Sequence, residues 1–169
     1  MMNMMHYQLM ARYNQWMNQR LYLACQSLSD DQRKADLGAF FGSIHNTLNH
    51  LLFADYLWMA RFENQPVAYR LGEEIFSDFL ALSQAREQFD QHIIAFSQTL
   101  TTTWLKTEIH YRSGIDNIIR TLPAWALLTH MFNHQTHHRG QITTLLSQQG
   151  IDVGITDIPW MPEWIPASL

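Results

Sequence analysis

The sequence has little glycine, proline or cysteine, and each shortage narrows what the protein can be. Its 169 residues include seven glycines and five prolines, while 47% are hydrophobic and 12% aromatic. This composition predicts a globular chain rather than a disordered or repetitive one. The single cysteine, Cys25, excludes an intramolecular disulfide and fits a reducing compartment.

Concentrated positive charge and long apolar runs are also missing. The formal net charge is −4 and the 11 basic residues are scattered, which argues against a nucleic-acid-binding face. Polar residues such as His6 and Arg12 interrupt the N-terminal segment before a signal peptide could form, and the longest apolar runs are far shorter than a membrane span. We expect a soluble, cytoplasmic protein with neither nucleic acid nor membrane as a partner.

Apolar residues recur every three or four positions over four long segments, which predicts four amphipathic helices. We also expect a turn or short helix near the aspartates that follow Ser29, a cap at Ser77 and a helix start at Pro123. One domain over residues 1–169 and an all-α helical bundle follow from this pattern and the chain length. The four segments are His6–Leu28, Phe40–Phe62, Ser77–Leu100 and Pro123–Gly150.

The segment before the last helix differs from the rest. Threonines, β-branched residues and the pair Ser113-Gly114 predict a short β-hairpin in which LKTEIHYR pairs with NIIRT. This insert and the connection over residues 63–76 are longer than tight bundle turns, so one or both should cross the bundle. The proline-rich tail DVGITDIPWMPEWIP should be irregular and pack across the bundle.

Four of the nine histidines lie between His130 and His138, in HMFNHQTHHRGQ. With His130 at 0° on a helical wheel, His134 falls near 40°, His138 near 80° and His137 near −20°, while the apolar residues cover roughly 60–160°. His134 and His138 therefore border the core, and His130 and His137 lie on the flank. Two imidazoles one turn apart can bind one metal ion, although they could also be hydrogen-bonded core residues or part of a solvated polar stripe.

A third ligand must come from another helix, and His45 and His50 are the natural candidates. They are about 140° apart on the wheel, so only one can face the site, and periodicity leaves the choice open. His6, His92 and His110 are weaker candidates. Gln135 follows His134 where zinc proteases of the HExxH type carry their glutamate base, so protease chemistry is not expected.

Two other residues of these helices have structural interpretations. Asp55 lies in the apolar stripe of its helix, where an unpaired carboxylate is costly. It could assist chemistry at a metal, but a salt bridge to a buried arginine such as Arg139 is the favoured interpretation. Gly140 is unfavourable inside a helix and suggests a close approach of another helix.

The runs FNHQTHHRGQITTLLSQQG, TLNHLLFADYLW and GITDIPWMP resemble those of the DinB-like (damage-inducible DinB/YfiT) family, and the resemblance extends over the whole chain. It implies a four-helix bundle with up-down-down-up connectivity. It also implies a divalent metal ion, nickel or zinc with iron or manganese as alternatives, held by His50, His134 and His138. Members of this family are often homodimers, which we carry over as an expectation.

Three histidine ligands would leave positions open for water or substrate, as in catalytic metal sites. The wider family resemblance includes transferases and isomerases that use low-molecular-weight thiols. We therefore expect a metal-dependent enzyme of the thiol S-transferase or hydrolase type with a small-molecule substrate, and the sequence assigns no catalytic residue. The alternative is a non-catalytic metal-binding stress-response protein in which the metal is structural.

Overall fold

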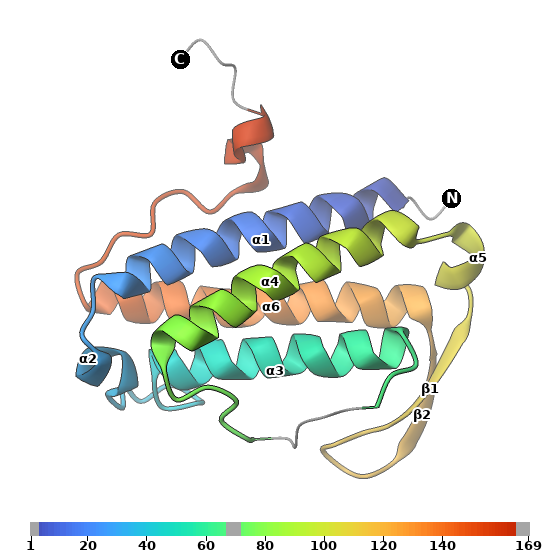
Figure 1. Cartoon of the computed structure of the whole chain (residues 1–169), viewed down its shortest axis with the longest axis horizontal. Helices are drawn as coiled ribbons and strands as arrows, with labels where there is room; N and C mark the ends of the chain where they lie inside the picture. The colour runs from blue at the N-terminus through green and yellow to red at the C-terminus, as the bar shows by residue number, and fades with distance from the viewer. Residues whose placement is uncertain (1–3, 67–71, 165–169) are drawn as a thin grey trace.

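Four long helices form the body of the molecule, as the apolar periodicity predicted. A computed structural model describes residues 4–66 and 72–164 (Figure 1). The long helices are α1 (Met4–Gln26), α3 (Ile44–Phe62), α4 (Phe79–Thr99) and α6 (Ala124–Gln148). Two short helices, α2 (Asp30–Lys34) and α5 (Thr102–Leu105), lie in the connections.

The helix directions give up-down-down-up connectivity. In Figure 1, α1 and α6 run in one direction, and α3 and α4 run in the other. Helix α1 packs against α4 and α6, and α3 packs against α6 and more loosely against α4. Because α3 and α4 are parallel, the chain between them must return along the length of the bundle, which makes this connection the expected crossover. Residues 67–71 of the connection lie outside the described part of the chain.

The helix starts are fixed by caps. The Ser43 hydroxyl accepts a hydrogen bond from the amide of Asn46, so α3 begins at Ile44. The prediction that this helix begins near Phe40 is wrong, because Gly42 adopts a positive φ of 75° before the cap and Phe40 lies outside the helix. Asp78, rather than the predicted Ser77, caps α4 by accepting from the amide of Ala81.

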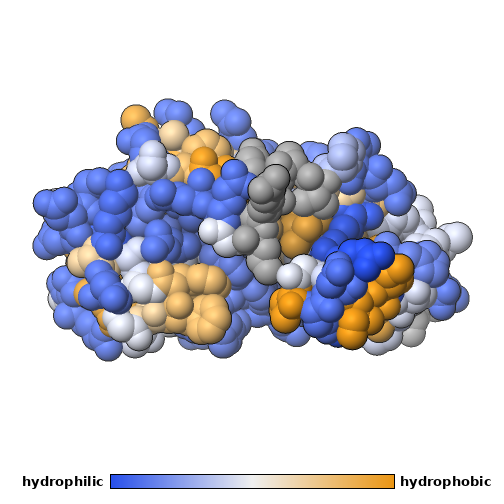
Figure 2. Space-filling model, turned by 90° about the horizontal axis from the view of Figure 1, so that it is seen from below, coloured by the Kyte–Doolittle hydropathy of each residue, from blue (hydrophilic) through white to orange (hydrophobic). Residues whose placement is uncertain are grey.

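The β-hairpin is present where it was predicted. Strands β1 (Glu108–Arg112) and β2 (Ile119–Pro123) are antiparallel, with Glu108 opposite Pro123 and Arg112 opposite Ile119. Pro123 ends β2 and is also the N-cap residue of α6, so one residue joins the hairpin to the last helix. Figure 2 shows apolar surface beside strongly polar surface at this end of the molecule.

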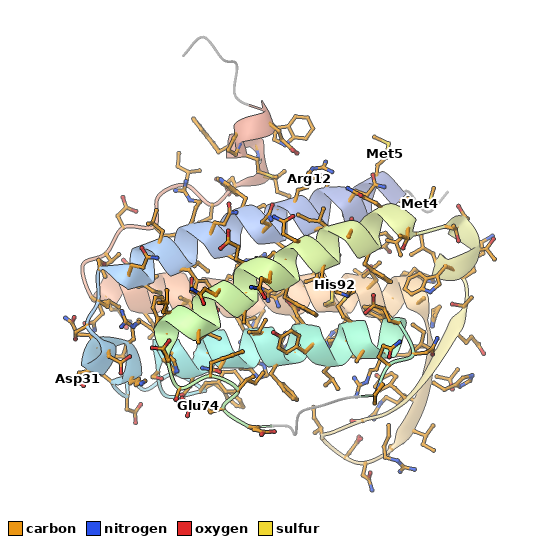
Figure 3. All side chains as sticks on the ribbon, in the orientation of Figure 1. Met4, Met5, Arg12, Asp31, Glu74 and His92 are labelled. Atoms are coloured by element: carbon orange, nitrogen blue, oxygen red, sulfur yellow. The ribbon has the colours of Figure 1, made fainter. Side chains whose placement is uncertain are left out.

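The tail after α6 is irregular apart from two 3-10 turns, η1 (Ile158–Trp160) and η2 (Pro162–Trp164). Contacts with α1 hold it against the bundle. Tyr13 donates a hydrogen bond to the carbonyl of Thr156 at 2.8 Å, and Arg12, which points from α1 toward the tail, pairs with Glu163 at 3.1 Å (Figure 3). No helix in the described ranges is long and apolar enough to cross a bilayer.

The core consists of two apolar clusters with buried polar side chains between them. One cluster includes Leu21, Leu52 and Ile142, and the other includes Ala11, Trp58 and Phe132. On every long helix, polar residues that are at most 3% exposed lie between the segments that supply the two clusters. We call these residues the polar layer: Asn14, Asn18, Asp55, Arg86, Asp90, Gln135 and Arg139.

Gly140 does not mark a close approach of two helices. It is exposed, and a Cβ atom added there would meet no heavy atom within 4 Å. The space around this position is open among the described residues, so the prediction of a close helix approach is wrong.

Candidate metal centre

The structure brings together the three histidines that the family resemblance implied. His50 on α3 lies with its Nε2 atom 3.2 Å from Nε2 of His134 on α6. Nε2 of His138, one helical turn further along α6, is 3.1 Å from the same atom. The candidate ligand nitrogens of all three residues lie within 4.8 Å of one another. Three imidazoles are therefore positioned to bind one metal ion.

Two of the three nitrogen separations match those around a metal ion. Bonds of 2.0–2.1 Å to zinc place two nitrogens about 3.3 Å apart in tetrahedral geometry and roughly 3.0 Å apart at a right angle. The observed 3.1 and 3.2 Å fall between these values. The donor set therefore fits a divalent ion that accepts imidazole ligands, and it is compatible with nickel as well as zinc.

Helix α6 divides its four histidines as the wheel predicted. His138 is 7% exposed and His134 is half-buried, whereas His130 and His137 are exposed. The His130 ring lies 5.8 Å from that of His134 and 5.2 Å from that of Trp58. Neither flank histidine belongs to the group of converging nitrogens.

The other histidines of the chain have different partners. His45 is fully buried with its Nε2 atom 2.9 Å from the carbonyl of Phe76, so of the two candidates on this helix it is His50 that lies with the converging rings. His92 pairs with Glu63 at 3.0 Å, and His110 lies 2.6 Å from the hydroxyl of Thr121. These contacts hold neighbouring segments together, and none of the three residues belongs to the group of converging nitrogens.

Two neighbours orient the converging imidazoles. The Oε1 atom of Gln141 lies 2.7 Å from Nδ1 of His138. A proton on Nδ1 donates to this oxygen and leaves the lone pair of Nε2 directed at the other rings. Phe41 stacks on His50 with ring centroids 3.9 Å apart and an interplanar angle of 25°. The orientations of both rings are therefore set before a metal binds.

The environment keeps these imidazoles neutral. Burial, followed by the proximity of His138, lowers the pKa of His50 to about 4. Burial and the neighbouring histidines lower the pKa of His134 to about 3, and burial also lowers that of His138. A metal binds the neutral form of imidazole, so at neutral pH no proton has to leave before these nitrogens can coordinate.

A cavity of about 350 Å³ opens beside His50. Its walls include Phe41, His50 and Phe53 on one side and Glu73 and Glu74 on the other. Figure 3 shows Glu74 on the connection between α3 and α4. The cavity is large enough for a small molecule to approach His50 from solvent.

The buried amide of Asn49 fixes the wall of the cavity that carries the glutamates. It donates to the carbonyl of Phe76 at 2.9 Å and accepts from the amide of the same residue at 3.0 Å. The chain that follows Glu73 and Glu74 is therefore held against α3 near His50.

Asp55 is an ion-pair residue, but its predicted partner is wrong. Its Oδ2 atom lies 2.7 Å from Nη1 of Arg86 on α4, whereas Arg139 donates to Oδ1 of Asn14. Burial raises the pKa of Asp55, and the contact with Arg86 opposes this increase. Arg86 is closer because it projects from α4 into the polar layer. A helical wheel describes one helix and cannot predict such a contact between two helices.

Gln135 is a buried residue beside the site that the sequence reasoning considered only as the replacement for a catalytic glutamate. It is 0% exposed and lies between the two candidate histidine ligands of α6 in sequence. The signal that could have identified it was available, because position 135 falls near 140° on the wheel, within the apolar stripe.

Cys25 is not a candidate nucleophile. The residue is fully buried, and burial raises the pKa of its thiol to about 12. At neutral pH this thiol stays protonated, so any thiolate that reacts at the histidine site would have to come from a substrate.

Comparisons with known proteins agree with this fold and sequence pattern. The model of the DinB family matches residues 1–168. Protein DinB of Bacillus subtilis is 27% identical over 151 residues, which cover 86% of this chain and 87% of that protein. The uncharacterized protein YrdA of the same organism is 36% identical over 83 residues, covering 49% of this chain and 48% of that protein.

A crystal structure of a DinB-like protein from Bacillus cereus is similar in fold. The TM-score is 0.61 at 17% identity, and the alignment covers 82% of this chain and 89% of that one. This similarity supports the arrangement of the helices.

Proposed function

The chain belongs to the DinB family, and from this premise we propose that it is a metal-dependent enzyme of the thiol S-transferase type. The observation that carries the proposal is the convergence of His50, His134 and His138, with an open cavity beside His50. Zinc or nickel is the proposed ion, with iron or manganese as alternatives. Three protein ligands leave coordination positions free, which is typical of catalytic rather than structural metal sites.

The proposed reaction joins a low-molecular-weight thiol to an electrophilic small molecule. A sulfur–carbon bond forms, the leaving group departs with its electron pair, and the thiol proton passes to solvent. A bound divalent ion would supply Lewis-acid chemistry that lowers the pKa of a coordinated thiol. The chain's own residues hold the imidazoles neutral and oriented, and they shape the cavity in which the electrophile would lie.

The reducing cytoplasm is the proposed setting, because low-molecular-weight thiols remain reduced there and Cys25 is a free thiol. A hydrolase that uses the same ion and cavity, with water in place of the thiol, is the related form of the proposal. A homodimer remains a prediction from the family resemblance.

Metal analysis of the purified wild-type protein, followed by thiol conjugation assays, tests the proposal. We expect one equivalent of divalent metal per chain and faster consumption of a thiol in the presence of chlorodinitrobenzene. Removal of the metal with a chelator should abolish the acceleration, and its return should restore it. A protein that carries no metal and binds neither added zinc nor added nickel would contradict the proposal.

Two alanine substitutions on α6 test the choice of ligands. We expect His134→Ala to abolish metal binding, because it removes the central nitrogen, which lies within 3.2 Å of both others. His137→Ala is the matched control on the same helix, since its exposed ring lies outside the converging group. Isothermal titration with zinc measures both variants, and the opposite result would refute the ligand assignment.

The alternative function is a stress-response protein in which the metal only holds the bundle together. It predicts a closed coordination shell, a large loss of thermal stability on metal removal and no turnover with any thiol. The half-buried His50 and His134 and the cavity beside His50 favour the catalytic proposal, because a structural site is usually enclosed.

A further inference from the structure

Gln135 links the two helices that carry the metal ligands. Its Nε2 atom donates a hydrogen bond to the carbonyl of Leu51 at 3.2 Å. In sequence, Gln135 directly follows the ligand His134, and Leu51 directly follows the ligand His50. The bond therefore joins α6 to α3 one residue beyond a ligand on each helix.

Beyond this bond, charged and amide side chains of the polar layer connect the long helices. Burial raises the pKa of Asp55, and Arg86 and, to a smaller extent, Gln135 oppose this increase. Arg86 of α4 pairs with Asp55 at 2.7 Å and with Asp90 at 2.8 Å.

The contacts of the polar layer continue from α4 through α1 to α6. Asp90 accepts hydrogen bonds from Asn14 at 3.3 Å and from Asn18 at 3.0 Å, and Asn14 accepts in turn from Arg139 of α6. The chain of contacts thus returns to the helix on which Gln135 lies, at the residue that directly follows the ligand His138.

Gln135 is a poor choice if stability alone is considered. Its Oε1 atom is buried, and no donor in the described part of the chain reaches it. An unpaired buried oxygen costs free energy, and an apolar side chain of similar volume would avoid this cost. A role other than stability therefore explains the residue better.

We propose that Gln135 is a positioning residue of the metal centre, which uses the polar layer as a frame to fix the separation and register of α3 and α6 at the three histidines. The inference rests on the proposed metal site. Without the Leu51 bond, α3 and α6 would be held at this level by apolar packing and by the histidines themselves, and packed helices tolerate small sliding movements. His50 would then sample positions that no longer match His134 and His138.

Gln135→Met separates positioning from stability, because methionine has a similar shape and is readily accommodated in cores. We expect the variant to unfold within a few degrees of the wild type. Its affinity for cobalt(II) or zinc should nevertheless fall about tenfold or more, as is typical when a residue supporting a metal ligand is lost. The visible absorption bands of the cobalt(II)-loaded protein should also change, since they report the ligand geometry.

Leu105→Ala is the matched control. Leu105 is fully buried near the hairpin, in the apolar cluster that includes Trp58 and Phe132. Its truncation should therefore lower the melting temperature. The affinity for cobalt(II) and the absorption bands should stay those of the wild type.

The titration distinguishes failure of this inference from failure of the proposed function. If the wild type itself binds no cobalt(II) or zinc, the proposed metal site is wrong. If the wild type binds and folded Gln135→Met matches its affinity and spectrum, only the positioning role is refuted. A Leu105→Ala variant that loses affinity as much as Gln135→Met would also refute it, because the effect would then follow stability.

Discussion

At the scale of single residues, the site depends on side chains that would not touch the metal. Gln141 accepts from Nδ1 of His138 at 2.7 Å and so selects the tautomer whose Nε2 faces the other imidazoles. Gln141 Nε2 also lies 3.4 Å from Nε2 of the exposed His137, whose ring lies 4.8 Å from that of His138.

Gln141→Leu should weaken metal binding without removing a ligand. Loss of the acceptor frees His138 to adopt the other tautomer, and we expect the zinc affinity to fall by about 10–100-fold. Competition with a chromophoric chelator measures the change. Gln141→Glu keeps an acceptor at the same place and should retain tight binding, whereas equal affinities for the leucine variant and the wild type would contradict the proposed role of this contact.

At the scale of elements, two glycines give a matched comparison: one has the helical conformation inside α6, and the other has a positive φ just after its end. Gly140 lies inside the helix in open space, and Gly150 lies just beyond its end with a φ of 76°, also without a nearby atom. Gly140→Ala should stabilise the protein by about 1 kcal/mol, because alanine favours the helix. Gly150→Ala should destabilise it by about 1 kcal/mol, because its φ suits only glycine without strain.

Urea unfolding in the presence of a chelator measures both glycine variants without a contribution from bound metal. If Gly140→Ala is destabilising, the position must be close to something that the isolated chain does not show, such as a second copy of the chain. If Gly150→Ala is neutral, the helix end must rearrange without cost.

The elements could be predicted from the sequence because each depends on local signals. Apolar spacing located the four long helices, and the Ser113-Gly114 turn with its β-branched neighbours located the hairpin. The boundaries were less accurate. Phe40 and Ser77 look as helical as their neighbours, and only the cap contacts of Ser43 and Asp78 show where the helices begin. The short α5 was missed because four residues contain too little periodicity.

At the scale of the whole molecule, the polar layer was largely invisible to sequence reasoning. Polar residues in apolar stripes were a signal for Asn14, Arg86 and Gln135, but their partners depend on the register between helices. Single-helix wheels do not contain this register, which is why Asp55 was assigned to Arg139 instead of Arg86. The choice of His50 over His45 also needed more than periodicity, and the family resemblance supplied it before the structure placed the rings.

The polar layer also separates the two apolar clusters, and this arrangement has a consequence for specificity. Sliding one helix by a turn would bring apolar residues against Asp55, Arg86 or Asp90, and it would leave charges buried without partners. Buried polar groups can fix the register of packed helices in this way. The same register brings His50 level with His134 and His138, so the fold and the candidate metal site depend on one set of contacts.

The stability of the whole molecule should depend on pH through the metal-free site. The pKa values of His50 and His134 are about 4 and about 3 in the folded chain, against about 6.5 for histidine in an unfolded chain. Below pH 6.5 the unfolded chain therefore binds protons that the folded chain does not, and the free energy of unfolding decreases as the pH falls toward 4. Above about pH 6.5 both states are neutral at these residues, and their contribution no longer changes.

Urea unfolding of the metal-free protein between about pH 4.5 and 7.5 measures this dependence. The double variant His50→Gln, His134→Gln is the control, and we expect its stability to fall less steeply below pH 6.5 than that of the wild type. Asp55 and Asp90, whose pKa values burial raises, are present in both proteins, so the difference between the two curves isolates the histidines. Parallel curves would mean that the two imidazoles are protonated as easily in the folded chain as in the unfolded one, and that the site is not held in the neutral, metal-ready form.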